Sequence, residues 1–148
     1  MRAFHFRLDQ ALRWRAGQLD LEKSRVSLAA RLLQDLRLEL DTCRRDMADG
    51  AGQLSANGGT GSSLALWAGF TDRSRRQIKD LETRAGQAEQ ALAAQMQLLV
   101  AANRQVRLLE NLKQGQHGRW QAEFSRELEA FAGESYLFRL QSRNRMGA

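Results

Sequence analysis

Residues 49–63 read DGAGQLSANGGTGSS, and this stretch decides how the rest of the chain is arranged. It holds five glycines and no repeating apolar positions, so it lacks both the stripe and the propensity of a helix. We therefore predict a loop over 49–63. A flexible linker between two domains is the alternative, but neither flank has the residues for an independent globular core.

The residues before this loop carry an apolar stripe that repeats every seven residues. A second row of apolar residues accompanies it, and only Arg15 and Glu22 interrupt that row. This spacing predicts a long helix over about 6–48. The first row is Leu12, Leu19, Val26, Leu33, Leu40 and Met47, and the second includes Leu8, Ala29, Leu36 and Cys43.

The residues after the loop repeat the pattern and predict a second helix over about 64–143. The phase weakens between Lys113 and Gly118, where QGQHG places two glycines close together, and a skip or a bend is expected there. The first row is Ile78, Ala85, Leu92, Leu99 and Val106, and the second is Leu81, Ala88, Ala102 and Leu109.

Together these patterns predict an all-α fold, with two long helices in an antiparallel coiled-coil hairpin that spans residues 1–148. The chain has no proline, which favours uninterrupted helices, and aromatic residues are only 7% of it, which suits a thin seam between two helices. Both termini are expected at one end of the hairpin, with the surplus of the second helix projecting beyond the amino terminus or folding over it. Heptads do not distinguish a seam within one chain from a seam between two chains.

Enzymatic chemistry is not expected. The only histidines, His5 and His117, have no cysteine or second histidine at metal-ligand spacing, and an exposed polar position is expected for His117. The glycine-rich GGTG at 58–61 lacks the Lys-Ser/Thr pair of a phosphate-binding loop. We predict no catalytic residues, cofactor, metal or small-molecule substrate. The single cysteine, Cys43, the lack of a secretory signal and the lack of a long apolar run favour a cytoplasmic protein.

The net charge is +6, from 23 basic and 17 acidic residues. A solvated, arginine-rich helix surface explains this charge, and an acidic protein surface or a nucleic acid as partner is the alternative. Basic residues are interspersed with acidic ones until about Glu134. Beyond it, three arginines have no acidic neighbour: Arg139, Arg143 and Arg145.

Two groups of aromatic residues are candidates for protein binding. Trp67 and Phe70 follow the loop, and they either pack on Leu40, Cys43 and Met47 or form an exposed anchor. At the other end, Phe4 and Phe6 precede the first helix. Internal packing is the default expectation for these and for the aromatic residues late in the second helix, and a basic, aromatic tip that enters an acidic ring is the alternative. The late aromatic residues are Trp120, Phe124, Phe131, Tyr136 and Phe138.

The sequence also resembles the FliJ family, small coiled-coil proteins of the bacterial flagellar export apparatus, and their type III injectisome counterparts. The resemblance rests on the opening Phe4-x-Phe6-x-Leu8-Asp9-x-Ala11-Leu12-x-x-Arg15, on Leu21-Glu22-Lys23, and in the second half on Trp67 with Phe70, Val106-x-x-Leu109-Glu110-x-Leu112-Lys113, Trp120-x-x-Glu123 and Arg126-Glu127. It spans nearly the whole chain. The stretch Gly133-Glu134-Ser135-Tyr136 departs from the close of the family's second helix.

This resemblance implies a non-enzymatic stalk that binds and activates a hexameric export ATPase and links it to the cytoplasmic domain of the membrane export gate. It also implies contacts with the regulator of the ATPase and with export chaperones, and a cytoplasmic location associated peripherally with the inner membrane at the flagellar base. The expected ATPase-binding tip is Phe4, Phe6, Arg7, Arg139, Arg143 and Arg145. The expected gate-binding face is Leu36, Leu40, Met47, Trp67 and Phe70.

Two other functions remain open on the sequence alone. A basic coiled coil of this kind binds nucleic acid if its arginine-rich face meets phosphate groups, although nucleic acid is the less favoured partner. A structural coiled coil that dimerises with itself is the third possibility.

Overall fold

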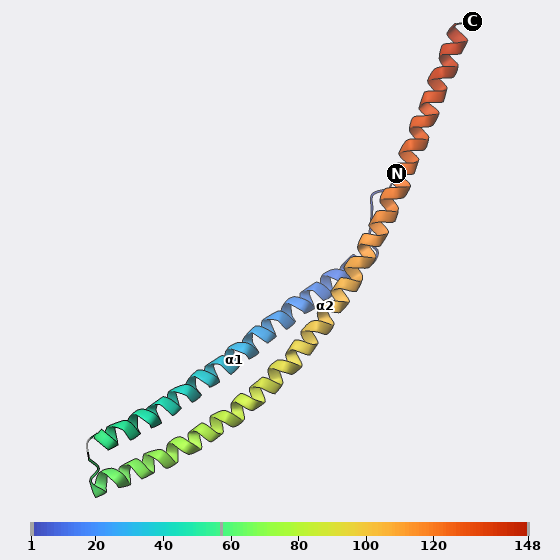
Figure 1. The fold of residues 1–148 in the computed structure, drawn as a ribbon. Coiled ribbons are helices and arrows are strands. Elements are labelled where there is room, and N and C mark those ends of the chain that lie inside the picture. Colours follow the sequence, from blue (N-terminus) through green and yellow to red (C-terminus); the bar gives the residue numbers. More distant parts are fainter. Residues whose placement is uncertain (1, 57, 148) are drawn as a thin grey trace. The chain divides into compact units, whose positions relative to one another are not determined.

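The structure is a computed structural model that describes residues 2–56 and 58–147. Over these residues it contains two long helices and no strand (Figure 1). Helix α1 runs Asp9–Ala56 and helix α2 runs Gly61–Met146. The two helices pack against each other, and the predicted all-α helical hairpin is confirmed.

The chain divides into two compact units, and both helices contribute to each. The loop unit is Gln18–Ala102, and the terminal unit is Met1–Gly17 with Asn103–Ala148. In the loop unit the two helices lie side by side in opposite directions, joined by a short connection (Figure 1). In the terminal unit the beginning of the chain lies along the second half of α2.

Two ion pairs fix the register of the helices in the loop unit. The Arg37 guanidinium lies 2.7 Å from the Glu89 carboxylate, and that of Arg44 lies 2.9 Å from Glu82. Seven residues forward along α1 therefore correspond to seven residues back along α2. This is the register that two antiparallel heptad repeats need to keep their apolar rows in contact.

The predicted rows form the seam between the helices. Leu33 packs with Ala85 and Ala88, and Leu36 and Leu92 flank this buried group. Alanine on α2 gives the leucines of α1 room to approach closely, because a larger side chain opposite them would hold the helices apart. The two polar residues that interrupt the first-helix pattern also lie at seam positions and are half-buried: Arg15 and Glu22.

The predicted loop at 49–63 is too long. Helix α1 continues to Ala56 and α2 begins at Gly61, so the described connection is residues 58–60, and residue 57 lies outside the described residues. Gly50 and Gly52 are helical despite their poor helix propensity of about 1 kcal/mol relative to alanine. Side chains from the other helix pack against this part of α1, and that packing outweighs the propensity cost.

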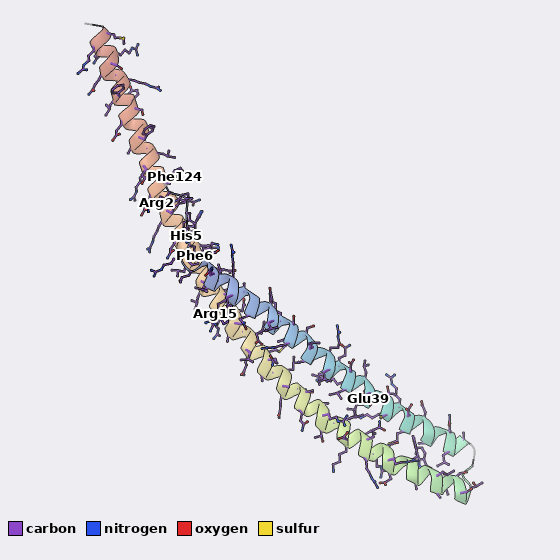
Figure 2. The ribbon with its side chains drawn as sticks, turned by 180° about the vertical axis from the view of Figure 1, so that it is seen from behind. Arg2, His5, Phe6, Arg15, Glu39 and Phe124 are labelled. Carbon is purple, nitrogen blue, oxygen red and sulfur yellow. The ribbon has the colours of Figure 1, made fainter. Side chains whose placement is uncertain are left out.

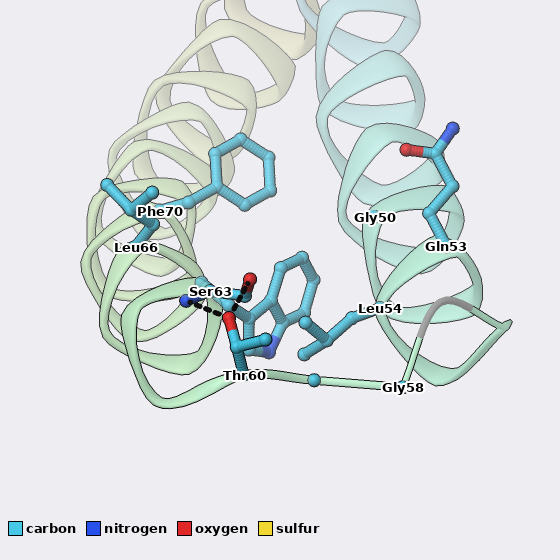
Figure 3. Close-up of a pocket in the computed structure, with 10 residues that line it drawn as sticks. Gly50, Gln53, Leu54, Gly58, Thr60, Ser63, Leu66 and Phe70 are labelled. Carbon is cyan, nitrogen blue, oxygen red and sulfur yellow. Dashed lines mark hydrogen bonds between the residues drawn. The ribbon is translucent and has the colours of Figure 1, made fainter.

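The connection has the two local features that a tight helix-to-helix turn requires. Gly58 has a φ of 62°, in the left-handed region that residues with a Cβ rarely adopt. Thr60 immediately precedes α2, and its hydroxyl oxygen accepts a hydrogen bond from the backbone N–H of Ser63 at 3.3 Å. Thr60 therefore caps the amino end of α2 (Figure 3).

The other helix ends also differ slightly from the expectation. Helix α1 begins at Asp9, not near residue 6, and the backbone N–H of Asp9 donates to the Phe6 carbonyl oxygen at 3.1 Å. Helix α2 ends at Met146, three residues beyond the predicted end. It is not interrupted between Lys113 and Gly118. The half-buried positions that follow Leu109 are Lys113 and His117, at two successive steps of four residues. This shifts the phase of the heptad pattern without breaking the helix.

Candidate protein-binding surfaces

The segment before α1 is not helical, and it packs along α2 in the terminal unit (Figure 2). The Phe4 ring meets the His117 ring edge-on, with 4.8 Å between their centres, and also contacts the Trp120 ring. The Trp120 indole N–H donates to the Arg2 carbonyl oxygen at 3.2 Å. His117 is consequently half-buried and not exposed as expected, because an aromatic ring covers it.

Phe6 anchors this segment, since only 3% of its surface is exposed. The Lys113 ammonium lies 6.0 Å from the centre of the Phe6 ring and donates a hydrogen bond to Asp9 Oδ1 at 3.0 Å. That hydrogen bond is the main reason why the pKa of Asp9 is lowered, and the nearby charges of Lys113 and Arg13 lower it further. Phe6 is therefore part of the internal packing and does not present its ring to a partner.

The part of α2 that follows has no other described segment of the terminal unit against it (Figure 1). We call residues 121–146 the exposed C-terminal segment, because only Ser135 and Ser142 in it are half-buried and every other residue is exposed. Phe131 is 69% exposed and Phe138 is 72% exposed. The default expectation of internal packing is therefore wrong for the aromatic residues at the end of α2: Phe131, Tyr136 and Phe138.

The residues of the expected ATPase-binding tip do not form one cluster. Phe4 and Phe6 lie beside Lys113 and Trp120, and Arg7 is exposed nearby. The three late arginines lie farther along α2, beginning nineteen residues or about 28 Å beyond Trp120 at the rise of a helix. They share one property, which is exposure to solvent: Arg139, Arg143 and Arg145.

A second candidate surface lies at the loop end of the helices. Trp67 and Phe70 are half-buried, with their ring centres 5.5 Å apart, and a Cβ added to Gly50 would lie 2.5 Å from Cζ3 of Trp67. Both rings thus point from α2 toward α1. A pocket opens beside them, and Figure 3 shows Leu54 of α1 and Thr60 of the connection among the residues that line it.

The expected gate-binding face lies mostly inside the seam. Leu40 is only 8% exposed, and the other residues of that face are half-buried: Leu36, Met47, Trp67 and Phe70. The most accessible apolar side chain at this end is instead Leu66, which is 76% exposed. It sits one position before Trp67 and therefore off the heptad row. The heptad rule itself could have placed Leu66 outside the seam.

The part of the chain that the structure describes holds no group of three or more His, Cys, Asp or Glu side chains arranged to bind a metal ion. None of its helices has a stretch apolar enough to cross a lipid bilayer. The geometry thus provides exposed side chains on helices and a shallow pocket beside the connection. Comparisons with protein-family models, with curated proteins and with solved structures find no match to this chain.

Proposed function

We propose that the protein is a coiled-coil stalk of a bacterial type III protein export apparatus, of the flagellar kind. In this role it binds and activates a hexameric export ATPase, links it to the cytoplasmic domain of the membrane export gate, and escorts export chaperones. The protein itself carries out no chemistry. The sequence resemblance to the FliJ family suggests this function, and the antiparallel packing of two long helices is the fold that such a stalk requires.

The observation that supports the proposal most is the exposed C-terminal segment. A single helix that is not covered by its own chain presents side chains on every face, and so it suits contact with several subunits that surround it. Arg139, Arg143 and Arg145 add three positive charges to its last eight residues and are exposed. An acidic lining on the ATPase would attract them and orient the segment.

The experiment measures ATP hydrolysis by the cognate export ATPase with and without the purified protein. We expect the wild-type chain to raise the rate and the R139E/R143E/R145E variant to lose that effect. A matched control is R31E/R45E/R75E, which changes the net charge equally at three exposed arginines of the loop unit. The control should still stimulate the enzyme.

An unchanged hydrolysis rate at a stoichiometric excess of the wild-type chain would count against the stalk. If both triple variants lost the stimulation equally, the effect would depend on net charge and not on the exposed C-terminal segment. For the gate, L66S should weaken binding to the cytoplasmic domain of the export gate protein, because Leu66 is the accessible apolar residue beside Trp67. Gate binding unaffected by L66S would place that contact elsewhere.

A further inference from the structure

The exposed C-terminal segment retains the apolar spacing of a coiled coil although nothing in the described chain covers it. Phe124, Phe131 and Phe138 follow one another at intervals of seven, and Leu128 lies between the first two at the spacing of a second row. All four side chains are exposed to solvent. An apolar row of this length on one helix is the pattern of a face that packs against another helix.

This row continues a face that is already used for packing. His117, seven residues before Phe124, is covered by Phe4, and the Trp120 ring stacks on the Phe124 ring at 5.6 Å between centres and 4° between planes. Cover from the described residues of the amino-terminal segment therefore ends within one turn of Phe124. Beyond that point the apolar row continues, but no other described residue of the terminal unit packs against it.

The charges of the segment divide between its two halves. Residues 121–134 hold four acidic residues and one basic one, whereas residues 135–147 hold three arginines and no acidic residue. A helix of this kind is complementary to a copy of itself that runs in the opposite direction, since the acidic half of each faces the basic half of the other. A parallel arrangement would instead bring like charges together.

We propose that two copies of this chain associate through residues 121–146, as an antiparallel coiled coil with twofold symmetry. Phe131 and Phe138 lie at its centre and bury their rings against the same residues of the second copy. The acidic first half of each segment pairs with Arg139, Arg143 and Arg145 of the other. Such an interface is self-complementary, so one surface serves both copies and the association closes at two.

This inference is independent of the proposed function, although the two concern the same arginines. Pairing of two copies covers the arginines that the export stalk would offer to an ATPase. Binding to the ATPase would then require the dimer to dissociate. The experiments below use this chain alone, so their failure leaves the ATPase test unaffected, and the reverse also holds.

Sedimentation equilibrium of the full chain at micromolar concentrations tests the association. We expect a monomer–dimer equilibrium for the wild-type chain, and a dissociation constant raised about tenfold or more in F131S/F138S, since burial of two rings is lost. The matched control is L21S/L28S, which removes two exposed leucines of α1 outside the segment. It should dimerise like the wild type.

Charge variants test the pairing of the two halves. R139E/R143E/R145E leaves Arg126 as the one basic residue among seven acidic ones, and E123R/E127R/E129R/E134R makes the segment basic throughout, so neither should dimerise alone. An equimolar mixture of the two should form a heterodimer. Higher salt should weaken the wild-type dimer, because exposed ion pairs are screened.

Disulfide cross-linking tests the orientation, in a C43S background that removes the native thiol. Phe131 opposite Phe138 places position 124 of one copy opposite position 145 of the other. Chains that carry F124C should therefore cross-link to chains that carry R145C, and neither should cross-link efficiently to itself. A wild-type chain that stays monomeric at all concentrations overturns the proposal. So does a dimer that survives F131S/F138S, or efficient cross-linking of F124C chains to one another.

Discussion

Gly50 of α1 lies directly against the indole ring of Trp67 of α2, so close that an added Cβ would come within 2.5 Å of Cζ3. Glycine in the middle of a helix is normally a weakness, yet here its missing side chain is the space that the ring occupies. The contact holds the loop ends of the two helices together.

G50A should therefore destabilise the protein, although alanine is the better helix former by about 1 kcal/mol. The new methyl group displaces the Trp67 ring and loses its packing on α1. Thermal unfolding followed by circular dichroism measures the change, and tryptophan fluorescence should shift as the ring becomes exposed. The matched control is G52A, two residues farther along the same helix, where a Cβ meets nothing within 4 Å. G52A should raise stability, and an equal gain from G50A would contradict the contact.

The pair Asp9 and Lys113 should make stability depend on pH in the acidic range. The pKa of Asp9 lies below its ordinary 3.8 because Lys113 donates a hydrogen bond to the carboxylate. The ionised form therefore stabilises the folded state, and this contribution is present above the ordinary pKa and is lost as the pH falls through the lowered value. In K113M the midpoint of the Asp9 carboxyl titration, followed by NMR, should move up toward 3.8. K79M, a lysine in the loop unit, should leave the midpoint unchanged.

The ion pair between Arg37 and Glu89 provides a test of register more than of stability. Both side chains are more than half exposed, so R37E should cost only about 0.5–1 kcal/mol at low salt, including the new repulsion. The double variant R37E/E89R should recover this loss. R37E/E82R should not, because Glu82 pairs with Arg44 and the swap leaves like charges opposite one another at two places. Recovery in both double variants would mean that the register is wrong.

Glu22 is a polar residue in an apolar seam, and its replacement by an apolar residue should stabilise the folded state. Its Oε1 accepts a hydrogen bond from Arg25 at 2.7 Å, but its Oε2 is buried and has no hydrogen-bond partner among the described residues. E22L should stabilise the folded state by about 1–2 kcal/mol in chemical denaturation, because burial of the unpaired oxygen is removed. E39L, at an exposed position of the same helix, should change stability by less than about 0.5 kcal/mol. A loss in E22L would show that the carboxylate is needed.

The heptad rows carried enough information to predict the two helices and their contact, because the periodicity of apolar residues is a local property of the sequence. The same rows also extend into the stretch that was predicted as a loop. Gly50 follows Met47 by three residues and Leu54 follows Gly50 by four, so both continue the seam. Glycine lowers the helix propensity of the segment, and this favoured a loop. A seam position can nevertheless require the absence of a side chain, as Gly50 does beside Trp67.

The candidate surfaces were harder to predict, because exposure depends on where the partner helix ends. The aromatic spacing around Phe131 is the same whether or not another segment covers it. Only the structure shows that the amino-terminal segment reaches as far as Trp120. Likewise, Phe4 covers His117 by a contact between an irregular segment and a helix, and no periodicity in the sequence reports such a contact.

The contact between the Arg2 carbonyl and Trp120 joins residues that are 118 positions apart, whereas Arg44 and Glu82 are 38 apart and Arg37 and Glu89 are 52 apart. Closing a longer stretch of chain costs more entropy, so contacts nearest the connection form first and the others follow in order of separation. Folding should therefore begin near Gly58 and proceed away from the connection. Unfolding should begin with the amino-terminal segment. Backbone amides around Trp120 should therefore exchange their hydrogens sooner than those around Leu33 and Ala85.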